Sequence, residues 1–354
     1  MSTLKVDGIR NNSATSDAIT LASDGTCQAK LVRVGGGGLS GFRNLVINGN
    51  MKIHQKTNLA LSTTLGYRTA DRFYVRATST STIFHNSCLN GVLKCYGANA
   101  VTAFDTRHGI EWDDEFYGKT MTLSFNATTQ SGGVKVAVEL VDGAITTTAQ
   151  DYAHVTGTTV NVYNYTLNST SGWYGNKYVL TVDIPSDADV SFTPDMLRLR
   201  IGNSNSGSSQ SFELSNVQLE FGDTPTVFEY EPEHITLDKC LRYLYVIRVN
   251  DADVVCSQTA YAKSTTNARG VFFLPKSMRT YPTYTGTATD VQFYAQNSSG
   301  YFHYDDILSS LGNVQSVHNN TWAWTVTTTS ISGGQGGVLL GRTETGQLEF
   351  SAEL

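Results

Sequence analysis

The sequence predicts an all-β protein with an N-terminal β arm, a jelly-roll-like β-sandwich, a short helix and a small C-terminal β-sandwich. Short runs of alternating apolar residues recur along the chain, separated by Gly, Asn, Ser and Asp clusters, as half-buried strands with turns require. Charged residues make up only 16% of the chain, which is typical of strands with uncharged polar outer faces. A single segment has the spacing of an amphipathic helix. Together these observations favour strands over helices throughout.

Residues 1–34 are predicted to form a β arm, with a hairpin turn at Asp24-Gly25. An arm this short has too little apolar area to fold alone, so we expect it to dock on companion subunits or on a larger assembly. The alternative is a disordered tail. The apolar residues expected to anchor it are Leu4, Val6, Ile9, Ile19 and Leu21.

Residues 35–41 are glycine-rich and are predicted to be a flexible linker. The glycines also invite comparison with a phosphate-binding loop. Such a loop requires Lys-Ser/Thr after the glycines and then a helix, and both are missing here.

Residues 42–232 are predicted to form the jelly-roll-like sandwich. Two segments frame it, 42–51 at the start and 216–229 at the end, and both show the alternation of half-buried strands. The segment 216–221 should be the last strand, closing the sheet beside an early one. The clearest strand signals begin at Phe73, Gly91, Thr120, Val134, Tyr178 and Met196.

Residues 233–250 are predicted to form a connecting helix, with Thr236 as its N-cap and Asp238 in its first turn. Its apolar stripe should pack on residues 251–354, a C-terminal β tip domain that is the expected receptor-binding part. The stripe consists of Leu237, Cys240, Leu241, Leu244 and Tyr245.

The cysteine pattern predicts free thiols. Asn90-Gly91 is a two-residue hairpin signal, and in that register Cys88 faces Leu93 while Cys95 lies diagonal to Cys88, beyond disulfide reach. An odd count without CxxC also argues against zinc. We therefore expect a protein made in a reducing cytoplasm. The five cysteines are Cys27, Cys88, Cys95, Cys240 and Cys256.

The net charge of −6 argues against nucleic-acid binding, which needs a basic surface. The N-terminus lacks the apolar core of a signal peptide, and no apolar run is long enough to span a membrane. The seven histidines are scattered without zinc-binding spacing, and we expect most of them at the surface or in turns.

The densest acidic cluster is Glu111-Trp-Asp-Asp-Glu. It is interpreted as a solvated loop anchored by Trp112. Two alternatives stay open: a carboxylate of a glycoside hydrolase, and a weak calcium or glycan contact through Asp113, Asp114 and Glu115. No cofactor is expected.

An aromatic stretch after the turn at 297–300 is the candidate recognition surface. Exposed rings beside carboxylates suit sugar binding, because rings stack on C–H faces and carboxylates accept hydroxyl protons. The alternative is that Phe302 and Tyr304 fill a strand core. Core packing is also expected for Trp322 and Trp324. The candidate receptor-binding or glycan-binding residues are Tyr301, His303, Tyr304, Asp305 and Asp306.

Several motifs, in order, resemble bacteriophage fibre and appendage proteins. The opening motif is Asn44-Leu-Val-Ile-Asn-Gly-Asn with Gln55 and Ala70-Asp-Arg-Phe. The closing motif is Gln218-Leu-Glu-Phe-Gly with Thr226-Val-Phe-Glu and Cys240-Leu-Arg-Tyr. The stretch 275–283, the ending Ser351-Ala-Glu-Leu and the start at Ser2, which is similar to cyanobacterial phage virion proteins, complete the resemblance.

The resemblance implies a homotrimeric, non-enzymatic virion fibre, with a tail fibre preferred, that attaches the particle to a host surface glycan or protein. Its arm would contact other virion proteins. It also implies an Asp71-Arg72 pair that can bridge charge at a strand start, and a final strand with a Phe tucked back. The alternatives are a capsid fibre or architectural adaptor without a receptor and, less favoured because no β-solenoid repeat is present, a depolymerase tailspike.

Overall fold

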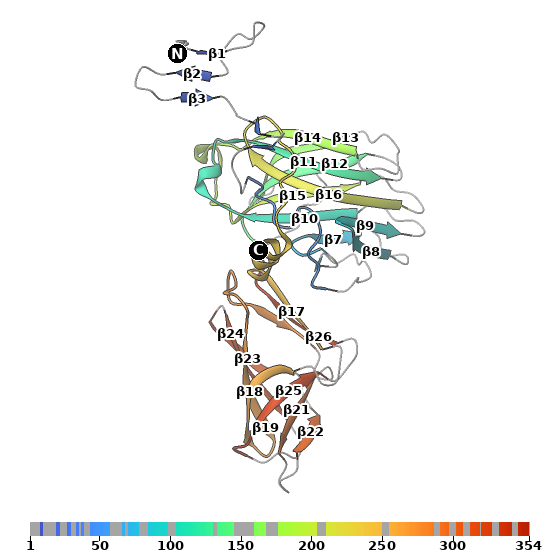
Figure 1. The fold of residues 1–354 in the computed structure, drawn as a ribbon, viewed down its shortest axis with the longest axis vertical. Helices are drawn as coiled ribbons and strands as arrows, with labels where there is room; N and C mark the ends of the chain where they lie inside the picture. Colours follow the sequence, from blue (N-terminus) through green and yellow to red (C-terminus); the bar gives the residue numbers. More distant parts are fainter. Residues whose placement is uncertain are drawn as a thin grey trace, which may run out of the picture.

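The computed structural model shows an elongated molecule, with two β bodies stacked along its long axis and small strands beyond the first body (Figure 1). The C-terminus returns to the boundary between the two bodies. The structure describes residues 8–9, 19–21, 27–29, 33–34, 37–38, 43–56, 66–67, 70–77, 84–97, 104–129, 133–144, 159–167, 176–203, 210–249, 255–286, 291–296, 302–306, 312–318, 320–327, 333–341 and 346–353.

The first body is a sandwich of two antiparallel sheets, which confirms the predicted all-β fold. The six-stranded sheet has the order β13-β12-β15-β10-β7-β6, and the five-stranded sheet has the order β14-β11-β16-β9-β8. Their bounds are β6 Gly66–Tyr67, β7 Tyr74–Ala77, β8 Phe84–Leu89, β9 Val92–Gly97, β10 Phe104–Glu111, β11 Thr120–Thr129, β12 Val134–Val141, β13 Thr159–Leu167, β14 Asn176–Asp183, β15 Met196–Asn203 and β16 Gln210–Phe221.

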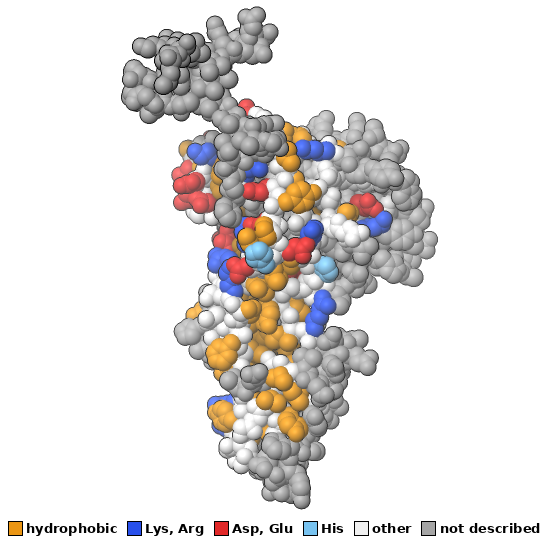
Figure 2. Space-filling model, viewed as in Figure 1, with side chains coloured by type: hydrophobic (Ala, Val, Ile, Leu, Met, Phe, Trp, Pro, Cys, Tyr) orange, Lys and Arg blue, Asp and Glu red, His pale blue; other side chains and the backbone are white. Residues whose placement is uncertain are grey.

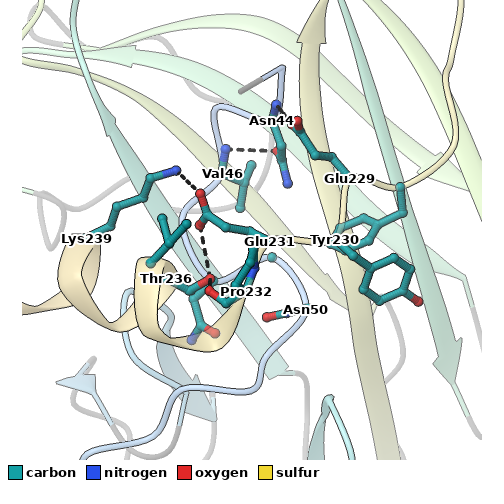
Figure 3. Close-up of a pocket in the computed structure, with 13 residues that line it drawn as sticks. Asn44, Val46, Asn50, Glu229, Tyr230, Glu231, Pro232, Thr236 and Lys239 are labelled. Atoms are coloured by element: carbon teal, nitrogen blue, oxygen red, sulfur yellow. Dashed lines mark hydrogen bonds and ion pairs between the residues drawn. The ribbon is translucent and has the colours of Figure 1, made fainter. Parts of the chain in front are cut away.

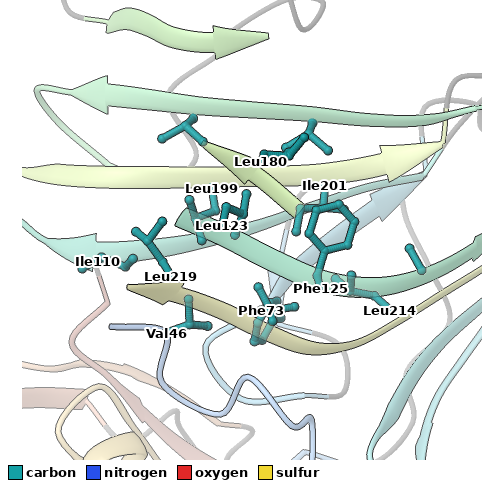
Figure 4. Close-up of a cluster of buried hydrophobic side chains, with 14 of the residues drawn as sticks. Val46, Phe73, Ile110, Leu123, Phe125, Leu180, Leu199, Ile201, Leu214 and Leu219 are labelled. Atoms are coloured by element: carbon teal, nitrogen blue, oxygen red, sulfur yellow. The ribbon is translucent and has the colours of Figure 1, made fainter. Parts of the chain in front are cut away.

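The core of this body lies between the two sheets (Figure 4). Alternate residues of each strand point inward, as the period of two requires. On β11, Leu123 and Phe125 are buried, and on β15 Leu199 and Ile201 face them from the other sheet. Val46, from the opening segment, joins the same cluster.

The outer face of the six-stranded sheet holds five buried charges that the sequence analysis did not find. Glu139 accepts hydrogen bonds from Arg198 Nε (2.6 Å) and Arg200 Nη1 (3.2 Å), and Asp105 contacts Arg107 and Arg200. Burial lowers the pKa of Arg198, while Glu139 opposes this shift. These carboxylates keep the arginines ionised inside the fold.

The predicted hairpin at Asn90-Gly91 is confirmed. Both residues have positive φ, +53° and +78°, and β8 and β9 pair in the expected register with Cys88 opposite Leu93. Among the described side chains, Cys95, Cys240 and Cys256 form no disulfide with one another, as predicted for them.

The predicted opening strand is wrong. Residues 43–45 are irregular, Val46 is in a bend and 47–50 form turns, although the segment does lie beside the closing strand as expected. Leu45 N donates to Leu219 O, and Val217 N donates to Gly49 O, both at 2.9 Å. A Cβ at Gly49 would lie 2.0 Å from Val217 O, so only glycine permits this approach. The motif glycine thus serves a backbone contact with a bulged part of β16.

The segment after β16 folds back over its own strand. Thr226 N donates to Glu220 Oε1 (2.8 Å), and Glu229 N donates to Gln218 Oε1 (2.7 Å). Gln218 and Glu220 are almost fully buried by this contact. Two polar side chains on the outer face of the sheet therefore hold the chain that leads to the second body.

Helix α1 spans Glu233–Leu241, so the predicted helix over 233–250 is too long. Its N-cap position is Pro232, not Thr236, whose hydroxyl instead donates to Glu231 Oε2 (3.0 Å). Leu244 belongs to a strand because Tyr243 O accepts from Ala352 N (2.8 Å) and starts sheet pairing there. Two short 3₁₀ helices, η1 Asp114–Phe116 and η2 Asp187–Asp189, lie in loops of the sandwich.

The second body contains a three-stranded sheet, β17-β26-β20, and a seven-stranded sheet, β22-β21-β25-β18-β19-β24-β23. Its core includes Trp324, 1% exposed, as predicted, and Phe350. The side chain of Trp322 lies outside the described part. The bounds are β17 Leu244–Val249, β18 Val255–Ser264, β19 Asn267–Phe273, β20 Thr283–Thr285, β21 Val291–Gln296, β22 Phe302–Asp306, β23 Gly312–His318, β24 Thr321–Thr327, β25 Gly336–Gly341 and β26 Gly346–Ser351.

The N-terminal region contributes five two- or three-residue strands in two small antiparallel sheets. One of them falls in the predicted flexible linker, where Gly37–Gly38 pairs with Arg33–Val34. Leu4 and Val6 lie outside the described residues, and only the backbone is described for Ile9, Ile19 and Leu21. The strands are β1 Gly8–Ile9, β2 Ile19–Leu21, β3 Cys27–Ala29, β4 Arg33–Val34 and β5 Gly37–Gly38.

Candidate functional site

The boundary between the two bodies concentrates the polar residues of the family-like motifs. Charged side chains of both signs gather on the surface there, and apolar side chains continue down the second body (Figure 2). Among the described residues, no helix has both the length and the apolar character needed to span a bilayer.

Arg72 is the central residue of this boundary. Its side chain is 1% exposed and forms an ion pair with Glu353, 281 positions later and 4% exposed. The guanidinium also lies 3.5 Å from the centre of the Tyr243 ring and donates to Gly109 O at 2.5 Å. Arg72 therefore connects the sandwich, the end of α1 and the C-terminus.

The implied Asp71-Arg72 pair is wrong, because the two side chains take different partners. Asp71 accepts from Gln55 N (2.9 Å) and Gln55 Nε2 (2.7 Å). Burial raises the pKa of Asp71, and these hydrogen bonds oppose the rise. The positive φ of Arg72, +72°, turns the chain so that consecutive side chains separate.

Gln55 extends the same network into the second body. Its Nε2 donates to Leu244 O (2.8 Å), and its Oε1 accepts from Val246 N (3.2 Å), so it bonds to β17 as a strand would. Lys56 forms a 2.7 Å ion pair with Glu349 on β26. The motif residue Gln55 and its neighbour Lys56 thus contact β17 and β26, the two strands of the second body at this boundary.

Glu111, the first residue of the acidic cluster, also connects the sandwich to the residues that follow α1. It accepts from Arg242 Nη2 (3.1 Å to Oε2) and from the Tyr243 hydroxyl (2.7 Å). Burial opposes ionisation of Glu111, but these bonds outweigh it and hold its pKa below the usual value. Burial raises the pKa of Tyr243 to about 12, so the hydroxyl stays a donor.

Among the histidines whose side chains the structure describes, His54 and His234 are exposed as predicted, whereas His108 is buried. It is 1% exposed on β10, packs edge-on against Phe73 and lies 3.0 Å, through Nε2, from Ile47 O. Burial and the nearby Arg72 charge lower the pKa of His108 well below its ordinary value. The imidazole is therefore neutral in the folded protein at neutral pH.

A pocket of about 200 Å³ lies on the sandwich side of the boundary between the two bodies (Figure 3). Its walls come from the opening turns, the folded-back segment and the first turns of α1. Ion pairing and hydrogen bonding fix one wall, where Glu231 accepts from Lys239 (2.5 Å) and from Thr236. The lining residues are Asn44, Val46, Asn48, Gly49, Asn50, Phe228, Glu229, Tyr230, Glu231, Pro232, Ile235, Thr236 and Lys239.

Tyr230 lies at the mouth of this pocket. Its side chain is 68% exposed, and its ring meets Phe228 edge-to-face with centroids 5.0 Å apart. Glu229 Oε2 accepts from Asn44 N (2.8 Å), while Oε1 has no hydrogen bond to a described residue. Asn50 is 6% exposed, and its Oδ1 accepts weakly from Lys52 N (3.4 Å).

The remaining acidic-cluster residues have local roles. Asp113 caps η1 by accepting from Glu115 N (2.9 Å), and Asp114 accepts from Trp112 Nε1 (3.2 Å). Trp112 packs against the sandwich core, as predicted. Within the described ranges, no three His, Cys, Asp or Glu side chains come together as a metal site would require.

The predicted recognition stretch is only partly described. Residues His303, Tyr304, Asp305 and Asp306 form part of β22, the edge strand of the seven-stranded sheet, and only their backbone is described. Tyr301 lies outside the described residues. The structure therefore brings none of these side chains to a described site.

Sequence reasoning missed the pocket. Its lining comes from two stretches, 44–50 and 228–239, which lie more than 170 residues apart, and no spacing rule connects them. The opening and closing motifs could have indicated it, because both are rich in Asn, Gly and Glu and stand at the two ends of one body, which favours a polar contact between them.

No protein-family model and no curated protein matches this chain. Among solved structures, one described as "CBM4 structure and function" is 14% identical over 50% of this chain and 99% of that chain, with a TM-score of 0.32. The Stig cyclase Fisc from Fischerella sp. TAU is 10% identical over 52% and 98%, with a TM-score of 0.32. The active domain of bacteriophage CBA120 tailspike protein 4 is 14% identical over 51% and 21%, with a TM-score of 0.28. TM-scores this low establish neither a family nor a function.

Proposed function

We propose that this chain is a non-enzymatic subunit of a virion fibre, a tail fibre in preference to a capsid fibre, that attaches the particle to glycans on the host surface as a homotrimer. The observation that carries the proposal is the set of contacts at the boundary between the two bodies, called the junction below. Two β bodies are joined end to end through a buried ion pair, Arg72 with Glu353, and through Glu111 with Arg242.

The junction supports this function because an attachment fibre must transmit a fixed orientation from particle to cell. Ala352 and the side chain of Glu353 are buried at the boundary, where Ala352 N donates to Tyr243 O, and this closes the second body back on the first. A connection of this kind resists bending better than a single linker, since several segments would have to separate at once.

The surface of the second body is compatible with association. Tyr261 and Phe273, 48% and 68% exposed, lie on the same outer face of β18 and β19. Contiguous exposed apolar side chains mark contact surfaces, and these two rings would form part of such a patch between subunits. Three weak sites on one trimer, repeated over several fibres, would give strong attachment through avidity.

Adsorption of the purified full chain to host cells tests the proposal. We expect labelled protein to adsorb, to compete with whole particles, and to lose binding after periodate treatment of the cells, which cleaves sugar diols. Light scattering should give three times the 38.5 kDa chain mass. A protein that stays monomeric and never adsorbs would instead support an architectural adaptor, and release of soluble saccharide from envelopes would indicate a depolymerase.

A further inference from the structure

We propose that the pocket beside Tyr230 is a binding subsite for one neutral sugar unit, on the sandwich and apart from the predicted tip site. This inference rests on the proposed attachment function and assigns it a second, specific location. It comes from the shape, the lining chemistry and the charge of the pocket.

The first argument is the combination of an exposed ring with a preformed polar wall. Tyr230 is held by its edge-to-face contact with Phe228, so its outer face is available at little conformational cost. Sugar rings present C–H groups on one face and hydroxyls around the rim. An aromatic ring beside fixed polar groups matches both surfaces at once.

The second argument is the set of polar atoms left for a ligand. Glu229 Oε1 has no hydrogen bond to a described residue and can accept a hydroxyl proton. The Asn50 amide makes only the weak bond at Oδ1, so its Nδ2 is a donor without a described partner on a residue that is 6% exposed. One acceptor and one donor are what a pair of neighbouring sugar hydroxyls requires.

The third argument is charge. The ionised lining side chains are Glu229, Glu231 and Lys239, and Lys239 already pairs with Glu231. The remaining negative charge belongs to Glu229. An anionic ligand such as a sialic acid or a phosphate would be repelled, whereas a neutral saccharide would not.

The fourth argument is size. About 200 Å³ is below the ~300 Å³ at the low end of sites for drug-sized ligands. The pocket therefore suits a single sugar unit, such as the end or a side branch of a surface polysaccharide. A weak site of this kind gains effect from repetition within a trimer.

The test uses ligand-observed NMR on the full chain with methyl glycosides of glucose, galactose and mannose, with N-acetylglucosamine, and with sialic acid and inorganic phosphate as anionic probes. We expect at least one neutral sugar to saturate and neither anion to do so. Tyr230→Ala should weaken that binding by about tenfold or more, since a central aromatic contact contributes on this scale.

Two further variants keep the test specific. Asn50→Asp keeps the acceptor for Lys52 N and removes the donor, so it should also weaken binding severalfold. Tyr281→Ala is the matched control, because Tyr281 is a similarly exposed tyrosine, 60%, outside the pocket. The two tyrosine variants should keep the thermal midpoint of the parent, and Asn50→Asp should show one cooperative transition at a lower midpoint, because it places a charge at a buried position.

The outcomes separate the two proposals. The pocket is refuted if no neutral sugar saturates, if Tyr230→Ala and Tyr281→Ala weaken binding equally, or if the anions bind more tightly. Periodate-sensitive adsorption to cells that is unchanged in Tyr230→Ala would refute the pocket and leave the attachment function intact. Saturable sugar binding at Tyr230 without any adsorption to cells would refute the attachment function alone.

Discussion

The ion pair between Arg72 and Glu353 makes a quantitative prediction about the junction. Both side chains are almost fully buried, so replacing one of them leaves the other charge inside the protein without its partner. Breaking a buried pair in this way costs about 3–5 kcal/mol. Arg72→Met keeps the apolar stem against Tyr243, and Glu353→Gln keeps the shape of the acid, so each single variant should lose about 4 kcal/mol.

The double variant should lose much less than the two single variants together. If the sites were independent, the loss would be about 8 kcal/mol. With both charges removed, the remaining penalty is mainly the unpaired Gly109 carbonyl, which accepts from Arg72, at about 1–3 kcal/mol. The coupling free energy is therefore expected to be several kcal/mol in favour of the pair.

Urea unfolding followed by tryptophan fluorescence measures these values. Of the four tryptophans, Trp112 packs on the sandwich core and Trp324 lies in the core of the second body, so separate unfolding of the two bodies would appear as two transitions in the summed signal. Lys52→Ala is a suitable control, because its ion pair with Glu233 is exposed and should contribute little. Additive losses in the double variant would refute the assignment of Arg72 and Glu353 as a coupled pair.

Three other predictions follow from single sites. His108 is neutral in the folded protein and takes up a proton when the chain unfolds, so the free energy of unfolding should fall by about 1.4 kcal/mol per pH unit below pH ~6.5. In urea titrations from pH 7 to 5, His108→Gln should remove this part of the pH dependence. Gly49→Ala should lower the free energy of unfolding by more than ~2 kcal/mol, because its Cβ would clash with Val217 O. Gly118→Ala should lower it by about 1 kcal/mol, because Gly118 has a positive φ but open space around it. Equal shifts in thermal midpoint for the two variants would contradict this reasoning. Burial raises the thiol pKa of Cys240 and raises that of Cys256 to about 12. Both thiols should therefore resist iodoacetamide at pH 8 until the chain unfolds, which peptide mapping by mass spectrometry can show.

The strands were predictable because their signal is local. Alternation marked β11, β12 and β15, and the Asn90-Gly91 turn set the register of β8 with β9, all within a few residues of one another. The amphipathic spacing around Cys240 correctly indicated a helix. Each of these features is decided by side chains that are neighbours in the sequence.

The partners of the motif residues were not predictable in this way. Asp71 and Arg72 are adjacent and opposite in charge, so a mutual pair was the natural expectation. Arg72 instead takes Glu353, because the backbone turns at positive φ and because the second body places that carboxylate in the same buried space.

The end of α1 shows the same limit. The apolar spacing continues through Leu244 and Tyr245, and locally a helix would continue with it. Pairing of β17 with β26 ends the helix at Leu241, since the backbone groups after it find partners in a strand that is about 100 residues away.

The amino-acid sequence alone therefore determined the all-β class, most strand positions and one hairpin register. The tertiary structure decided where the helix ends, which charges pair across the junction and that a pocket forms beside Tyr230. The physical reason is that alternation and turn chemistry act between neighbours, whereas burial brings together groups whose separation along the chain carries no pattern.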